Sequence, residues 1–329
     1  MCKPFLPIFL LVSLLSSYSF ADSPSAHAPI GVMGEHIHKK GEVMVSYRYR
    51  NMQMDGNRVG SNRVSAEQVL EDFPVTPTDM TMEMHMFGLM FAPSDNLTLT
   101  LMLPYTELSM NHVTRTGVRF RTSSAGIGDI KLGGLYNLLD SESSNLIANF
   151  SLSLPSGEID ETFDTPAADD AQLPYPMQLG SGTVDLMPGL TFTDYYSCFD
   201  FPFSWGFQGI GTVRIDRNDN NYSLGDRFDS SVWSSLDLSN WLSVSLRSTW
   251  SIWGNVDGAD PLLNPSLVST ADPNLRGGRR VDLGFGLNLL HPTESFRLAL
   301  EFLTPVYQNL NGPQLETDRT WVFGAQYTF

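Results

Sequence analysis

The chain has 329 residues and carries 20 Lys and Arg against 36 Asp and Glu, a formal charge of −16 at pH 7. Nucleic-acid binding requires the opposite charge, so the composition excludes that class. The same acidity favours cations over anions as partners.

The first residues are typical of an exported protein. One Lys precedes an apolar run, and small residues follow at Ser19 and Ala21. This is the pattern of a secretory signal peptide cleaved after Ala21, and the run is shorter than the roughly 20 apolar residues of a membrane anchor. We therefore expect a signal peptide at 1–21, a periplasmic N-terminal segment at 22–40 and a single domain at 41–329.

After residue 40, apolar and polar residues alternate with a period of two, which indicates β-strands. Twelve such segments follow in chain order: 42–52, 79–90, 97–105, 129–138, 146–154, 185–193, 203–215, 228–238, 242–253, 280–289, 296–303 and 320–329. Bacterial transmembrane barrels have an even number of strands, and twelve agrees with that rule.

The connections between these segments alternate between long and short. The short ones are 92–96, 139–145, 194–201, 239–241 and 291–294. The long ones are 53–78, 106–126, 155–183, 216–226, 255–278 and 306–319. Short turns on one side and long loops on the other are the plan of a transmembrane barrel, whereas an exported soluble β-sandwich has no need of it.

The two faces of the predicted strands differ in chemistry. One face carries Leu, Val and Ile with aromatic residues near the strand ends, and the other carries Ser, Thr, Asn, Gly and mixed charges. A lipid-facing band and a wetted lumen explain both, and in lipid such a sheet must close. We predict an all-β, transmembrane, antiparallel up-and-down β-barrel of about 12 strands in the outer membrane of a Gram-negative bacterium.

Charged residues within the strands should point into the lumen, because a charge facing lipid at mid-depth would cost about 2–4 kcal/mol. Opposite charges there either pair across the lumen or set up a field that orients a solute. The side chains predicted to line the pore and shape its selectivity are Arg48, Glu83, Lys131, Arg247, Arg280, Asp282 and Glu301.

The stretch DMTMEMHMFGLM at 79–90 has a methionine face and a polar face. In one reading the sulfurs face lipid and Glu83 and His85 face the lumen, which requires a bulge near Gly88 to turn the following aromatic residues outward. In the other reading the sulfurs point inward as a ladder for a soft cation such as Cu(I). The predicted metal ligands are His36, His38, His85, Met82, Met84 and Met86.

An enzyme is a further functional class that the sequence could encode. A barrel lipase needs a nucleophile beside a His base held by a third group, and no His stands in a recognisable Ser–His setting. We therefore predict no catalytic residues and no enzyme activity, and an outer-membrane lipid hydrolase is the least favoured reading.

Several stretches resemble a known family, among them GVMGEHIHKKGEVMVSYRY, DMTMEMHMFGLMFAPSD, GIGDIKLGGLY, SLSLPSGEID and LPYPMQLGSGTVDLMPGLTF. They are similar to exported proteins called "transporters", whose relatives include outer-membrane proteins of the phenol meta-cleavage pathway. The resemblance implies an outer-membrane barrel that takes up small hydrophobic or aromatic compounds, and it supplies no catalytic residues.

The sequence thus favours an outer-membrane channel or transporter for a small solute that is hydrophobic or aromatic. The alternative is a barrel that binds or transports copper or another soft metal, and only that reading requires a cofactor. The expected partners are the lipid bilayer, the solute and the barrel assembly machinery, which would recognise the C-terminal Phe329 together with Tyr327 and Phe323.

Overall fold

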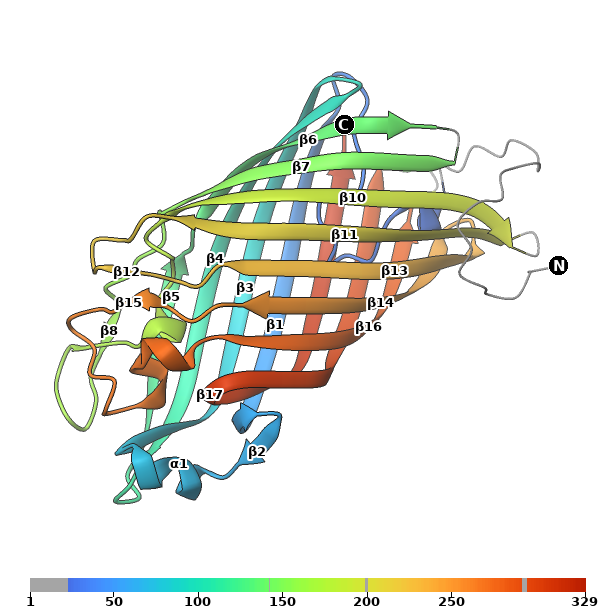
Figure 1. Cartoon of the computed structure of the whole chain (residues 1–329). Helices are drawn as coiled ribbons and strands as arrows, with labels where there is room; N and C mark the ends of the chain where they lie inside the picture. The colour runs from blue at the N-terminus through green and yellow to red at the C-terminus, as the bar shows by residue number, and fades with distance from the viewer. Residues whose placement is uncertain (1–22, 142, 199–200, 292–294) are drawn as a thin grey trace.

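The computed structural model describes residues 23–141, 143–198, 201–291 and 295–329, so the predicted signal peptide lies outside the described residues. The described chain forms one closed, all-antiparallel β-barrel (Figure 1). Its wall contains β1 (Val43–Gly60), β3 (Val75–Ser94), β4 (Leu97–Thr114), β6 (Ile130–Asp140), β7 (Ser144–Leu154), β10 (Val184–Cys198), β11 (Phe201–Ile215), β13 (Arg227–Ser239), β14 (Leu242–Trp253), β16 (Gly278–Leu290) and β17 (Phe296–Thr328).

The remaining elements are short and occupy the N-terminal segment and the long connections. They are the strands β2 (Asn62–Val64), β5 (Arg119–Ile127), β8 (Thr162–Phe163), β9 (Ala171–Gln172), β12 (Tyr222–Ser223) and β15 (Asp257–Gly258), the helix α1 (Ala66–Asp72), and 3-10 turns at Pro24–Ala26, Tyr175–Met177, Ser269–Ala271 and Pro273–Leu275. Among the described residues, no helix is long and apolar enough to span a membrane.

The 33-residue strand β17 crosses the barrel wall twice, and this makes the number of strands in the wall even. Its first part pairs with β16, from Arg297 to Leu310, and its second part pairs with β1, from Leu310 to Thr328. Eleven strands cannot close an entirely antiparallel ring, because neighbours must alternate in direction. The two parts of β17 therefore run in opposite directions, as two consecutive spans, and the predicted barrel of about twelve strands is confirmed.

Long and short connections alternate along the chain as predicted. The short turns follow β3, β6, β10, β13 and β16, and the long connections hold the small elements, which gather at the opposite end of the barrel (Figure 1). The Ser65–Gln68 capping box fixes the start of α1 in the first long connection. The long-loop end of the barrel is therefore covered by ordered structure.

The two faces of β3 differ in the exposed fraction of their side chains. Phe87 and Leu89 are 55% and 42% exposed, whereas Met90 is only 3% exposed. Met86 lies opposite Arg48 of β1, whose side chain is buried inside the barrel. Because side chains alternate along a strand, the methionines point inward and the aromatic residues point to lipid, with no change of face at Gly88.

Candidate functional site

The N-terminal segment, residues 23–42, enters the barrel at the short-turn end: residues 23–38 lie inside it, and residues 39–41 are exposed at its rim. The sequence predicts a periplasmic segment at 22–40, and in the structure most of these residues occupy the lumen. Side chains of seven strands hydrogen-bond its backbone. These pairs are Asp237 with the Ser25 amide, Ser204 with the Ser25 carbonyl, Asn288 with His27, Arg297 with Ala28, Arg48 with Ile30, Glu301 with Gly31, Gln208 with Met33, Asn149 with Gly34 and Thr98 with His38.

Apolar side chains of the same segment fill the space between these hydrogen bonds. Ile30 packs against Ala299, Leu303 and Val322 of the barrel wall. Ala28 and Val32 pack with the buried Trp233. Apolar residues alternate at 28, 30 and 32, and this pattern indicates that one face of the segment is buried. A segment surrounded by water would need no such apolar face.

Arg247 and Glu301 form a deeply buried ion pair in the lumen. Glu301 is 0% exposed and accepts two hydrogen bonds from Arg247, of 2.7 and 2.9 Å, and a third of 3.0 Å from the Gly31 amide. A fully buried carboxylate needs such a partner set, because an unpaired one is strongly disfavoured. The pair therefore ties the N-terminal segment to β14 and β17.

Further ion pairs lie along the inner wall towards the long-loop end. Arg280 contacts Asp282 at 3.0 Å, Arg227 contacts Asp229 at 2.6 Å, and Arg214 pairs with Asp185. These side chains come from β10, β11, β13 and β16, so the pairs form an arc around one side of the lumen. The acids on this arc are each already bound to an arginine.

Three inward basic side chains make no ion pair within the described residues: Arg48, Arg50 and Lys131. The Nε of Arg50 is buried and has no hydrogen-bond partner among them. Arg50 also lies within electrostatic range of Arg227, Arg247 and Arg280. The lumen is thus more basic than the acidic chain as a whole, and the global charge does not describe its interior.

Methionines cover the opposite part of the inner wall. Strand pairing places Met44, Met52 and Met54 of β1 beside Met90, Met82 and Met80 of β3. We call this surface, on β1, β3 and β4, the methionine wall, and its ten members are Met44, Met52, Met54, Met80, Met82, Met84, Met86, Met90, Met102 and Met110. The methionine sulfurs of residues 79–90 therefore point inward.

The long connection between β7 and β10 folds onto the outer end of this wall. Leu173 and Met177 pack with Met80, Leu108 and Met110 in one buried cluster. The hydroxyl of Ser124 donates a 2.6 Å hydrogen bond to the Met177 carbonyl. The loop therefore narrows the outer mouth of the barrel.

Two predicted site residues lie on the outer face instead. Glu83 accepts a 3.1 Å hydrogen bond from Asn51, and His85 contacts the Tyr47 hydroxyl at 2.8 Å among three tyrosine rings. Both share the outward parity of Phe87. Glu83 is thus not pore-lining, because β3 continues beyond the lipid-facing band and can carry polar residues outward there at no desolvation cost.

The other predicted residues point inward, but they do not form one site. Arg48, Lys131, Arg247, Arg280, Asp282 and Glu301 all face the lumen. His36 and His38 lie together in the N-terminal segment with ring centroids 4.8 Å apart, whereas His85 is outside the barrel. Met82, Met84 and Met86 belong to the methionine wall, so the six predicted metal ligands divide among three places.

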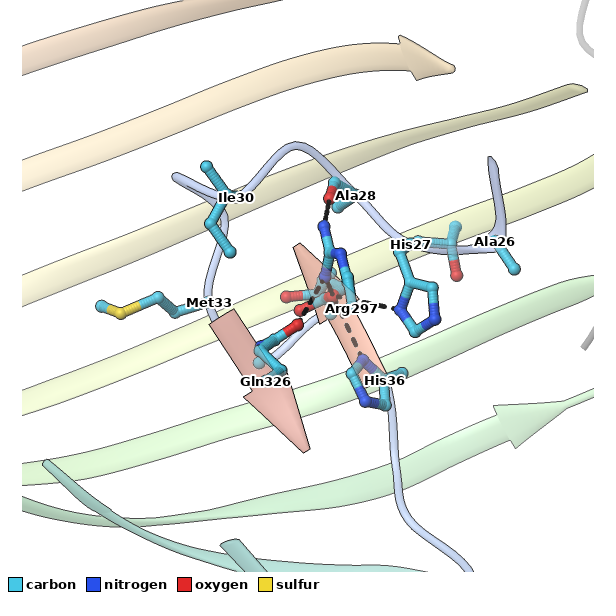
Figure 2. Close-up of polar contacts among 12 residues, drawn as sticks. Ala26, His27, Ala28, Ile30, Met33, His36, Arg297 and Gln326 are labelled. Atoms are coloured by element: carbon cyan, nitrogen blue, oxygen red, sulfur yellow. Dashed lines mark hydrogen bonds and ion pairs between the residues drawn. The ribbon is translucent and has the colours of Figure 1, made fainter. Parts of the chain in front are cut away.

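A different group of metal-binding side chains comes together in the N-terminal segment. Donor atoms of His27, Glu35 and His36 all lie within 4.8 Å of one another. Figure 2 shows the His27 and His36 rings converging beside Arg297. The sequence did not indicate that His27 and Glu35 lie beside His36, since nothing in it shows that the chain folds back between residues 27 and 35.

The environment of this group fixes its protonation. Burial, helped by the Arg297 charge, holds the pKa of His27 well below its ordinary value, and burial lowers the pKa of His38 to about 4. Although burial opposes it, contact with His36 and Arg297 lowers the pKa of Glu35 far below its usual range. At neutral pH His27 and His38 are therefore neutral and the Glu35 carboxylate is ionised, which are the forms that bind metal ions.

No protein-family model matches the chain, and no curated protein matches it in sequence. In fold it is similar to an outer-membrane channel from Pseudomonas putida F1, with 15% identity, a TM-score of 0.62, and coverage of 90% of this chain and 98% of that one. The chain has the fold of outer-membrane β-barrels. Weaker likenesses are the NanC porin (9% identity, TM-score 0.40, 87% of this chain and 98% of that one) and the transport unit of the Escherichia coli autotransporter AIDA-I (10%, 0.46, 89% and 91%).

Proposed function

We propose that the barrel is a channel for small organic anions with an apolar body. The observation that carries this proposal is that the methionine wall lies beside three inward basic side chains, Arg48, Arg50 and Lys131, that make no ion pair among the described residues. Arg50, for example, lies opposite Met84 in the pairing of β1 with β3. A solute with a carboxylate at one end and a ring or short chain at the other is complementary to both features.

The charge balance of the lumen supports an anion. The acids in the arc of ion pairs are held by their own arginines, whereas Arg48, Arg50 and Lys131 make no ion pair among the described residues. Fixed charges in a narrow, low-dielectric pore select permeant ions of the opposite sign. The acidic residues that dominate the composition are largely outside this region, in loops such as that between β7 and β10.

The methionine wall supports an apolar body. Thioethers are flexible and polarisable, and they pack against rings and aliphatic groups of varied shape. Unlike a polar lining, they offer only weak hydrogen-bond acceptors, which retain a hydrophilic solute poorly. The fold likeness to a protein described as an outer-membrane channel agrees with the proposal, as does the resemblance to transporter-type sequences.

The test compares solutes of similar size in proteoliposomes and measures ion selectivity in planar bilayers. We expect conductance with a reversal potential that indicates anion preference, and faster uptake of benzoate than of neutral benzamide or of acetate. Benzamide tests for the charge, and acetate tests for the ring. The absence of conductance, or a preference for cations, would disprove the proposal.

A second candidate is the passage of a soft cation along the methionine wall. Ten inward thioethers extend from Met54 and Met80 near the long loops to Met44 and Met90 near the short turns. Thioether ligands favour Cu(I), but the neighbouring Arg48, Arg50 and Lys131 oppose a free cation. Copper(I) uptake into proteoliposomes that exclude benzoate would favour this second function over the first.

A further inference from the structure

We propose that His27, Glu35 and His36 form a binding site for one copper(II) ion inside the barrel, at the short-turn end. The site goes beyond the proposed transport function and does not depend on it. It rests on the position of three donor groups, on a cavity between them and the wall, and on buried ring nitrogens that lack hydrogen bonds.

The donors converge on one carboxylate oxygen. The Oε1 of Glu35 lies 3.2 Å from the Nδ1 of His36 and 3.9 Å from the Nδ1 of His27. The two rings stand nearly perpendicular, with centroids 5.4 Å apart. Small changes in side-chain torsion can therefore direct both imidazoles and the carboxylate at a common ion.

A small cavity adjoins these donors. It measures about 20 Å³, and it is lined by His27, His36, Met44, Arg297 and Gln326 with three further residues. A space of roughly 10–15 Å³ already holds one water molecule, so a single ion fits. The thioether of Met44 on its wall adds a soft donor next to the imidazoles.

Two ring nitrogens at the site are otherwise unsatisfied. The Nδ1 atoms of His27 and His36 are buried without a hydrogen-bond partner among the described residues. The 3.2 Å contact of His36 with Glu35 is close enough for an ion pair, but its geometry is not that of a hydrogen bond. Buried polar atoms normally have partners, and a metal ion would give both nitrogens one.

The neighbouring arginine determines which class of metal fits. The Nη1 of Arg297 lies 3.3 Å from the Oε1 of Glu35 and balances the carboxylate charge. A hard ion such as calcium, which relies on anionic oxygens, gains little at such a site. Affinity must come from the imidazole nitrogens, and copper(II) binds nitrogen donors more strongly than the other divalent ions of its row.

The experiment measures copper in the folded, mature protein, purified in detergent without a histidine tag and dialysed against CuSO₄. We expect about one copper ion per chain, with nitrogen couplings in its electron paramagnetic resonance spectrum. The double variant His27→Ala/His36→Ala should lose this copper. The matched control is His85→Ala, because His85 lies on the outer face and its loss should leave the stoichiometry unchanged.

Three results would overturn the site: no copper on the folded wild-type protein, full stoichiometry in the double variant, or loss of copper in His85→Ala. Folding is checked for each variant by circular dichroism. If the double variant does not fold, the single variants His27→Gln and His36→Gln replace it, and each should lower the bound copper. Because copper is measured in detergent solution, a failure of the transport proposal leaves this test intact.

Discussion

Arg247 on β14 holds Glu301 on β17 through two hydrogen bonds, and the same carboxylate receives the amide of Gly31 from the N-terminal segment. The ion pair thereby links two wall strands to the chain inside them. Its strength depends on burial, since water would otherwise compete for each of these groups.

Replacing Glu301 with Gln should destabilise the barrel and release the N-terminal segment. The amide keeps the shape of the side chain but leaves Arg247 buried without its counter-ion, which costs about 3–5 kcal/mol. Unfolding in urea, and proteolysis within residues 23–42, would measure the two effects. The exposed pair of Asp318 and Arg319, 3.8 Å apart, is the control, and Asp318→Asn should change stability by about 1 kcal/mol or less.

Gly31→Ala should displace the same segment without altering any charge. A methyl group at residue 31 would collide with the Arg247 guanidinium and the Glu301 carboxylate. We expect faster proteolysis of residues 23–42 and larger single-channel conductance. Gly211→Ala is the matched control, because its methyl group would make only ordinary contact with Pro188 at 3.8 Å. Equal protease resistance of the two variants would contradict the close packing at Gly31.

Arg50→Gln should reduce anion preference, because it removes one of the three inward basic side chains that make no ion pair among the described residues. Reversal potentials in a salt gradient should move towards zero, with little change in stability. Arg279→Gln is the control, since Arg279 lies over the Tyr307 ring on the outer face, one residue away from the inward Arg280. A shift of the same size in both variants would show that general surface charge, and not Arg50, sets the selectivity.

Met177→Ala should loosen the loop between β7 and β10. Met177 is completely buried against Met80 and Met110, and truncating a buried methionine costs about 2–5 kcal/mol of local packing. Proteolysis within residues 155–183 should accelerate while the barrel stays folded. Leu262→Ala, at a side chain that is 67% exposed, should leave the cleavage rate unchanged.

The strand pattern and the barrel could be predicted because alternation is a local property. Each wall strand separates lipid from lumen, so its residues record the two environments directly. The alternation of long and short connections predicted which end of the barrel carries the short turns and which carries the long loops. The same reasoning placed Arg247, Asp282 and Glu301 inward, since a charge in the lipid band is too costly.

The errors arose where position along the strand matters as well as parity. Glu83 and His85 lie on the same outward face of β3 as Phe87. The sequence does not show that the lipid-facing band ends between His85 and Phe87, so it does not show that Glu83 and His85 can face outward. The interior position of residues 23–42 depends on contacts with strands up to 270 residues away. The His27–Glu35–His36 group follows from that position, and so it was equally invisible.

The last wall strand ends beside the first: Thr328 pairs with Met44, and the Phe329 amide bonds to the Val43 carbonyl. The barrel is therefore closed by the pairing of its last wall strand with its first. Three of the nine side chains that hydrogen-bond the backbone of residues 23–42 belong to β16 and β17: Asn288, Arg297 and Glu301. The contact that closes the barrel thus also completes the enclosure of the N-terminal segment.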